Sequence, residues 1–317
     1  MKFILNLWPP SQHVFEEITT ELAVNFKLLD VSDYEFSNKD NFEHLVREIY
    51  KIDGAKEEGV NIKVDRFTNL HHKKVARFKN FNKDTYTLRC IQFDIPNPKF
   101  RPRGSDGKPI STETEAIKKH YRHKYKGRIP NYIWDIIIHI GDNEVQTEKL
   151  MKLFGEHKNF KLNRNNLDMN FFLSTANNYK YFISKIDTPY VPQEFPNKYA
   201  IGKDLDIIVS KEHFEEFKKF CNLYSKTYPY FEIVWENETN GFGIRFEKNN
   251  QLHFKLDVRH SIEHISDEHI NNSLNNRVLH NGYYITENRF EKVFREVAYN
   301  YSKRPKPWHK EWLNNNG

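Results

Sequence analysis

The sequence predicts a two-domain protein of the α/β class: an α/β domain first, then an α+β domain with a mixed sheet and a helical C-terminal tail. Three observations predict this. The 317 residues exceed what one hydrophobic core usually serves. Strand and helix patterns alternate in the first half, which is typical of α/β domains. In the second half, three closely spaced strand patterns follow a strand–helix pair, and helical patterns come last.

The elements of the first half follow from hydrophobic spacing. Residues 3–7 and 26–31 predict strands, and residues 11–24 and 40–50 predict helices. This order suggests a parallel sheet. Later elements are expected as strands at 60–67, 85–95 and 134–140 and a helix at 144–154.

Basic residues concentrate in this half, although the net charge of the chain is only +6. Clusters occur at 71–77 and 118–128, and Arg101 and Arg103 lie in a long, irregular loop at 98–110. With Tyr121 and Tyr125 interleaved, these clusters could hold phosphates or a nucleic-acid backbone, or they could be solvated surface. No nucleic-acid motif accompanies them, so nucleic acid is possible but is not the favoured partner.

Polar residues gather where the strand at 134–140 is expected to end. They are His139, Asp142, Asn143 and Gln146. Ligands bind outside the carboxyl ends of strands in open α/β sheets, so this group is a candidate site. The alternative is a turn in which Asp142 or Asn143 caps the following helix.

Cysteine content and hydropathy indicate the cellular compartment in which the protein is expected. Only Cys90 and Cys221 are present, without a Cys-x-x-Cys motif, so neither a disulfide framework nor a structural zinc site is indicated. The apolar start is too short for a signal peptide, and no apolar run is long enough to span a membrane. The expectation is a cytoplasmic protein without a transmembrane segment.

The polar stretch at 155–159 is the predicted boundary, which gives domains at 1–156 and 157–317. In the second domain, helices are expected at 165–177 and 211–224 and strands at 181–186, 231–235, 242–246 and 252–258. Asn240-Gly241 predicts a hairpin. From Ser266 the chain is expected to be helical, interrupted at 279–285 and resuming at 288–301. His260, His264 and His269 lack a further ligand at zinc spacing and are interpreted as surface or core residues.

The run from Gly202 to Ser210 reads as a turn that leads into a buried strand. Successive side chains of a strand point to opposite faces, so Asp204 and Asp206 emerge on the same side. Asp257 lies on the polar face of the strand at 252–258. Carboxylates that share a small volume favour a hard divalent cation between them, so these acids are candidate ligands of Mg²⁺, or of Mn²⁺. The alternative is a strand-entry turn and a surface acid.

This arrangement resembles the nucleotidyltransferase fold of the DNA polymerase β superfamily, over the second half of the chain. The resemblance implies that Asp204, Asp206 and Asp257 bind two magnesium ions and that the following helix packs behind the sheet. The family usually has a Gly-Ser pair shortly before the paired acids, and this chain lacks it there. Ser184 is the nearest candidate.

The expected function is a magnesium-dependent nucleotidyl- or phosphotransferase. It would move a nucleoside monophosphate or a phosphate-linked group from a nucleotide donor to an acceptor hydroxyl of a sugar, a polyol or another molecule. Lys185, Lys203 or Lys255 could balance phosphate charge. A looser resemblance to the helical tail of nucleotidyltransferase-like domains implies that Arg295, Lys303 and Arg304 face the phosphates, and ordinary helix surface is the alternative. Two other functions stay open: a phosphotransferase of cell-surface polysaccharide synthesis with a CDP-linked donor, and a catalytically silent nucleotide- or RNA-binding module.

Overall fold

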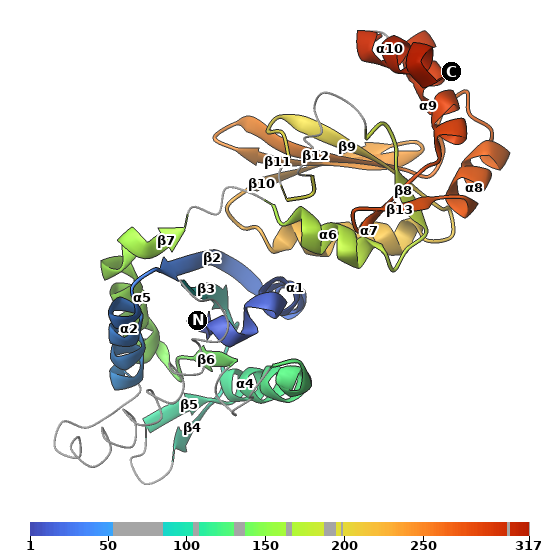
Figure 1. Cartoon of the computed structure of the whole chain (residues 1–317). Helices are drawn as coiled ribbons and strands as arrows, with labels where there is room; N and C mark the ends of the chain where they lie inside the picture. Colours follow the sequence, from blue (N-terminus) through green and yellow to red (C-terminus); the bar gives the residue numbers. More distant parts are fainter. Residues whose placement is uncertain are drawn as a thin grey trace. The chain divides into compact units, whose positions relative to one another are not determined.

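The computed structural model describes residues 1–52, 85–103, 108–129, 137–162, 167–186, 195–197, 199–302 and 305–316. The chain divides into two compact units, Met1–Asn166 and Leu167–Gly317. Both units combine helices and sheets, so the protein belongs to the mixed α/β class (Figure 1). The division falls later than the predicted boundary after residue 156, because a short strand at Lys161–Leu162 still pairs within the first unit.

The first unit contains helices around one main sheet and a separate strand pair. In chain order its elements are β1 Lys2–Leu7, η1 Pro9–Val14, α1 Phe15–Asn25, β2 Lys27–Phe36, α2 Lys39–Ile52, β3 Tyr86–Asp94, β4 Phe100–Arg103, β5 Lys108–Ser111, α4 Thr112–Tyr125, η4 Lys126–Arg128, β6 Ile138–Ile140, α5 Glu144–Glu156, η5 Lys158–Phe160 and β7 Lys161–Leu162.

The main sheet of the first unit has the strand order β6-β1-β3-β2-β7. All of its described strand pairs are antiparallel, so the expectation of a parallel sheet is wrong. The cause is that β3 inserts between β1 and β2, and a sequence pattern does not reveal such pairing. β4 and β5 pair in the loop that was expected to be irregular. The strand expected at 60–67 lies outside the described residues.

The second unit is built on one seven-stranded mixed sheet. Its elements are α6 Met169–Ala176, β8 Tyr181–Ile183, β9 Lys203–Val209, α7 Phe214–Lys226, β10 Glu232–Glu238, β11 Gly241–Lys248, β12 Gln251–Arg259, α8 Asp267–Asn275, β13 Val278–His280, β14 Tyr283–Ile285, α9 Asn288–Asn300 and α10 Pro307–Asn316.

The strand order of this sheet is β10-β11-β12-β9-β8-β14-β13. β9 runs parallel to β12, β8 runs parallel to β14, and the other pairs are antiparallel. The hairpin predicted at Asn240-Gly241 is confirmed, because it joins β10 to β11. The interruption predicted at 279–285 is a second hairpin, β13–β14, which adds its strands to the edge of the sheet beside β8.

Side-chain alternation along β9 directs two different sets of residues to the two faces of the sheet. Leu205, Ile207 and Val209 enter the larger core, where α6 and α7 cover the sheet. On the opposite face, Ile208 packs with Phe182 and with apolar residues of α8 and α9 in a smaller core (Figure 1). Asp204 and Asp206 share the face of Ile208. The acids of β9 therefore lie on the side of the sheet that the C-terminal helices partly cover.

Local side-chain hydrogen bonds set where several helices begin. The side chains of Ser111, Asp168 and Ser266 accept hydrogen bonds from the backbone N–H groups at the starts of α4, α6 and α8, respectively.

The helix α10 at the C-terminal end was not predicted from the sequence. Among the helices in the described part of the chain, none combines the length and the hydropathy that crossing a bilayer would require.

Candidate active site

Two of the predicted acids face each other on neighbouring strands of the second unit. In the parallel pair of β9 and β12, Asp206 lies directly opposite Asp257, and Asp204 lies opposite Lys255. Neighbouring strands are about 4.8 Å apart, and directly opposite residues point to the same face. The register, which the sequence pattern does not reveal, therefore brings Asp206 and Asp257 side by side.

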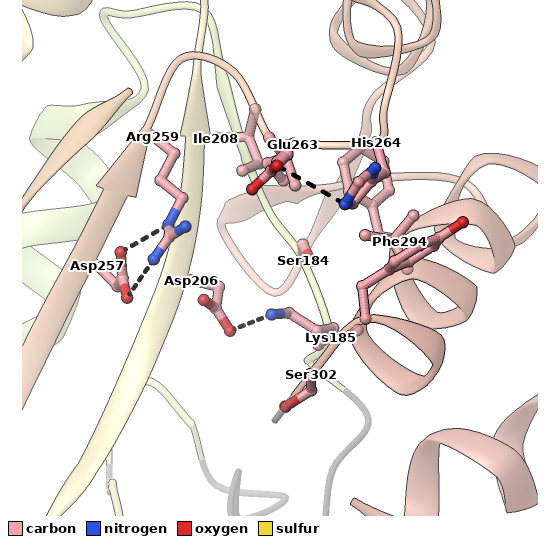
Figure 2. A pocket seen from close by; sticks show the side chains of 14 residues that line it. Ser184, Lys185, Asp206, Ile208, Asp257, Arg259, Glu263, His264, Phe294 and Ser302 are labelled. Atoms are coloured by element: carbon pink, nitrogen blue, oxygen red, sulfur yellow. Dashed lines mark hydrogen bonds and ion pairs between the residues drawn. The ribbon is translucent and has the colours of Figure 1, made fainter. Parts of the chain in front are cut away.

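Asp206 and Asp257 line a cavity of about 290 Å³ (Figure 2). Its charged and polar lining also includes Ser184, Lys185, Arg259, Glu263, His264, Tyr301 and Ser302. Its apolar lining consists of Ile208, Ile262, Phe294, Val297 and Ala298. The strands β9 and β12 contribute the two acids, and α9 contributes most of the apolar wall. The volume is at the lower end of the range of small-molecule sites, which fits a small ligand.

Lys185 neutralises Asp206 inside the cavity. The Lys185 Nζ atom lies 2.7 Å from Asp206 Oδ2. Burial favours the neutral carboxyl group, but the charge and hydrogen bond of Lys185 outweigh burial and hold the pKa of Asp206 below its usual range. More distant positive charges on Arg259 and Lys306 lower the pKa of Asp206 further. Asp206 is therefore ionised at neutral pH.

Arg259 binds the Asp257 carboxylate through two nitrogens of its guanidinium group. Its Nε atom donates to Asp257 Oδ1 at 3.0 Å, and its Nη2 atom donates to Oδ2 at 3.3 Å. A bidentate pair of this kind fixes the orientation of the carboxylate as well as its charge. Arg259 also pairs with Glu238 at 3.0 Å. The cavity thus presents two carboxylates and two cations at one end, as Figure 2 shows.

Three other predicted residues lie on the same strands but do not line the cavity. Asp204 is exposed, and Lys203 precedes it on β9. The Lys255 Nζ atom lies 2.8 Å from Glu236 Oε2 and 3.6 Å from Asp257 Oδ2. The absence of a side chain on Gly243 leaves room for Lys255, because a Cβ atom on Gly243 would lie 2.8 Å from Lys255 Cε. Lys255 therefore points toward the neighbouring strands β11 and β10.

Of the two remaining predicted substrate-binding residues, Ser184 lines the cavity and Arg295 does not. Ser184 lines the cavity at 3% exposure, and its Oγ atom has no hydrogen-bond partner among the described residues. Arg295 does not line the cavity and is fully buried, so it is not ordinary helix surface either. Its Nε atom donates to Glu291 Oε1 at 2.9 Å, and its guanidinium carbon lies 4.6 Å from the centre of the Trp312 ring. The other two cations expected to face phosphates, Lys303 and Arg304, lie outside the described residues.

Four residues of the site were missed by sequence reasoning: Arg259, His264, Glu291 and Tyr301. Arg259 had a usable signal, because strand alternation places it on the same polar face as Lys255 and Asp257. Tyr301 follows Phe294 and Val297 at helical spacing, a pattern that predicts packing against the core, yet it is 62% exposed and lines the cavity. His264 lies in a turn after β12, and Glu291 does not line the cavity but accepts a hydrogen bond from the backbone N–H of Lys185, which does. Nothing in the local sequence pattern indicated either of the last two positions.

In the described part of the first unit, three of the basic residues suggested as phosphate ligands pair with acids instead. In α4 and just after it, Lys118 pairs with Asp142, Lys124 with Glu21, and Arg128 with Glu17. Tyr121 and Tyr125 are buried. These charges are largely neutralised, and the tyrosines face the interior. The basic cluster at 71–77 lies outside the described residues.

The polar group after β6 behaves as a helix cap. Asn143 Oδ1 accepts a hydrogen bond from the Gln146 backbone N–H at 3.0 Å, so Asn143 is the N-cap of α5. Asp142 is ion-paired with Lys118, and His139 is buried. The argument for a ligand site assumed a parallel sheet, but β6 pairs antiparallel with β1. The capping interpretation is therefore confirmed for Asn143.

The lining fits a divalent cation in part. Carboxylate oxygens are the ligands that Mg²⁺ and Mn²⁺ prefer, and Asp206 and Asp257 place two carboxylates at one end of the cavity. Each carboxylate is held by a protein cation. In the described ranges, no group of three or more His, Cys, Asp or Glu side chains is placed to hold a metal ion. The cavity thus contains two of the three expected ligands, and Asp204 stands two residues from Asp206 on the same face of β9.

Comparison with known proteins adds no relationship: no protein-family model and no curated protein matches this sequence.

Proposed function

We propose that the cavity of the second unit is the active site of a divalent-cation-dependent nucleotidyl- or phosphotransferase. The reaction would transfer a nucleoside monophosphate or a phosphate-linked group from an activated nucleotide to an acceptor hydroxyl. The observation that carries this proposal is that Asp206 and Asp257 lie opposite each other in a small cavity together with Lys185 and Arg259. This combination supplies groups for a cation and groups for phosphate oxygens in one place.

Each charged side chain has a distinct role in this proposal. Asp206 suits cation binding better than proton transfer, because its lowered pKa makes it a weak base at neutral pH. Lys185 and Arg259 already neutralise the acids, and they would turn to donor phosphate oxygens when a cation takes their place. A bound Mg²⁺ or Mn²⁺ ion would neutralise charge on the phosphoryl oxygens. Asp257, on the neighbouring strand, is the candidate acceptor of the hydroxyl proton.

The test is consumption of labelled nucleoside triphosphates and CDP-linked donors, with and without Mg²⁺, by the full-length protein. Asp206→Asn and Asp257→Asn should each lower Mg²⁺-dependent turnover about 100-fold or more, since several kcal/mol of charge stabilisation would be lost. Asp267→Asn is the matched control, because it removes an exposed carboxylate of the same unit that pairs with Lys211 outside the cavity. Undiminished turnover in Asp206→Asn would refute the proposal.

The variant Asp204→Asn tests whether Asp204 is a third metal ligand or whether Asp206 and Asp257 are sufficient. If Asp204 is the third ligand, its replacement should reduce turnover as strongly as the replacement of Asp206. If the cavity acids suffice, Asp204→Asn should retain turnover within a few-fold. The measured Mg²⁺ concentration for half-maximal rate in this variant shows which version holds.

One observation favours a second function, a catalytically silent nucleotide-binding module. Both cavity acids pair with protein cations, Asp206 with Lys185 and Asp257 with Arg259, so neither carboxylate depends on a metal ion for its charge balance. In that case, nucleotides would bind without being consumed. Binding would also persist, or strengthen, in Asp206→Asn, because a negative charge near the phosphates is removed.

A further inference from the structure

The cavity has a second end, where apolar and aromatic side chains outnumber charged ones. Opposite the acids of β9 and β12, its wall is formed by Val297, Ala298 and Phe294 of α9 together with Ile262. The rings of His264 and Tyr301 also line it. Figure 2 shows Asp206 and Asp257 on one side and His264 and Phe294 on the other. The cavity is therefore polarised. The two aspartates and their cations lie at one end, and apolar and aromatic surface dominates the other, where Glu263 lies 3.8 Å from His264 Nε2.

Tyr301 and His264 form a flat aromatic surface at the cavity. Their ring centres are 4.0 Å apart with an interplanar angle of 21°, so the two rings are stacked. Tyr301 is nevertheless 62% exposed, although it ends a helix whose apolar residues Phe294 and Val297 pack inward. His264 has a φ of 67°, in the left-handed region that a histidine adopts only at a cost. The turn after β12 thus holds His264 against Tyr301, and most of the Tyr301 ring stays accessible.

We propose that this end of the cavity binds the base of the nucleotide donor, with Tyr301 as the stacking surface and Val297 and Ala298 as the adjoining wall. The inference rests on the proposed function and specifies which part of the cavity recognises which part of the donor. A nucleotide has the same polarity as the cavity, since its phosphates are charged and its base is flat and largely apolar. The volume of about 290 Å³ suits a mononucleotide rather than a polymer segment.

Stacking on an aromatic ring also sets the kind of selectivity to expect. Every base has a π-face, so a stacking surface discriminates little among bases while favouring nucleotides over compounds without a base. Truncation of a stacking aromatic typically costs about 1–3 kcal/mol per base, which is a factor of about 5 to 150 in the dissociation constant. Tyr301 would therefore determine that the ligand is a nucleotide, and the charged end would bind the phosphates.

The experiment measures binding of a nucleoside triphosphate and of inorganic tripolyphosphate, each with Mg²⁺, to the full-length protein by calorimetry. Tyr301→Leu should weaken nucleotide binding about 5- to 150-fold and leave tripolyphosphate binding within about twofold. Tyr301→Phe keeps the ring and should bind both ligands like the unaltered protein. Tyr299→Leu is the matched control, because it removes a tyrosine from the same helix outside the cavity lining.

The outcomes separate this inference from the proposed function. If Tyr301→Leu binds the nucleotide as tightly as the unaltered protein, the base does not stack there and the inference fails, while the transferase proposal stands. If the variant loses tripolyphosphate affinity equally, Tyr301 acts on the phosphates or the fold, and the inference also fails. If the unaltered protein binds neither ligand, both the proposed function and the inference are wrong.

Discussion

Lys185, two residues after the end of β8, has an uncommon backbone conformation and is held by contacts at both its backbone and its side chain. Its φ of 60° lies in the left-handed region, which is uncommon for a residue with a side chain. Its backbone N–H donates to Glu291 Oε1 at 2.7 Å, while its ammonium group lies 2.7 Å from Asp206 Oδ2. The same Glu291 oxygen accepts from Arg295. A buried carboxylate of α9 therefore links Arg295 to the residue that neutralises the cavity acid.

Replacement of Glu291 by Leu tests this link. The change removes the acceptor of the Lys185 N–H and leaves the buried Arg295 guanidinium without a carboxylate. Since an unpaired buried charge costs about 3–5 kcal/mol, we expect the free energy of unfolding to fall by about that amount. Urea unfolding measures it.

The double variant Glu291→Leu/Arg295→Met distinguishes packing from positioning. No buried charge is left unpaired, so stability should recover relative to Glu291→Leu alone. Lys185 still lacks its backbone acceptor, so tripolyphosphate binding should stay weaker than in the unaltered protein. If the double variant recovers both stability and binding, Glu291 has no positioning role.

The residue types and spacing predicted part of the site. Strand alternation placed Asp204 and Asp206 on one face and Asp257 on the polar face of its strand, before any pairing was known. The sequence could not predict which acid would lie opposite which, because strand register depends on tertiary packing. The looser resemblance implied that Arg295 faces the phosphates, with ordinary helix surface as the alternative, and neither fits a side chain that is fully buried and does not line the cavity. Its ion pair with Glu291, four residues earlier on the helix, is buried beneath α10.

At the scale of elements, local signals were predictable and long-range pairings were not. Asn240-Gly241 specifies a tight turn, and it does form the β10–β11 hairpin. The parallel sheet expected in the first unit rested only on the alternation of strands and helices, and β3, which arrives much later in the chain, pairs with both β1 and β2 instead. The segment 279–285 lacks a long strand pattern, because β13 and β14 have three residues each.

The helix α10 covers the buried pair of α9 with His309 and Trp312. Both residues are buried, and the Trp312 ring lies against the Arg295 guanidinium. Burial lowers the pKa of His309 to about 4, and the nearby positive charges of Lys185, Arg295 and Lys306 act in the same direction, against Asp206. The folded state, in which α10 is docked, therefore favours neutral His309.

This requirement predicts how stability depends on pH. The usual pKa of His309 is 6.5, so between pH 6.5 and about 4 the unfolded chain binds more protons than the folded chain. The stability that neutral His309 contributes is present above pH 6.5 and is lost as the pH falls toward 4. After allowance for solvent screening, we expect the free energy of unfolding to fall over this range by about 1–2 kcal/mol more in the unaltered protein than in His309→Leu.

Hydrogen exchange identifies which segment of the chain loses stability as the pH falls. The backbone amides of α10 after Pro307 should lose protection on acidification before those of β9 and β12, and this difference should be absent in His309→Leu. Glu291, whose pKa burial raises to about 7, titrates in both proteins, so the comparison removes its effect. Equal pH dependence of stability in both proteins would show that His309 does not control the docking of α10.

At the scale of the whole molecule, the cavity and the cores beside it can be assigned to one unit. Every described residue that lines the cavity, from Ser184 to Ser302, belongs to the second unit. The described residues of the two cores that flank its sheet belong to that unit as well. In the described part of the first unit, several basic residues pair with acids of the same unit. The net charge of +6 therefore does not by itself identify a ligand-binding surface.

This organisation predicts that a fragment of residues 163–317 folds alone and keeps the ligand site. Its length is typical of a single domain, and its sheet is covered by its own helices on both faces. We expect one cooperative urea transition and nucleotide binding within about threefold of the full chain, a difference of less than 1 kcal/mol. Circular dichroism and calorimetry measure these two properties, and residues 1–162 alone should bind no nucleotide. A fragment that folds but no longer binds would show that the first unit supplies part of the site, which would assign acceptor or donor recognition to that unit.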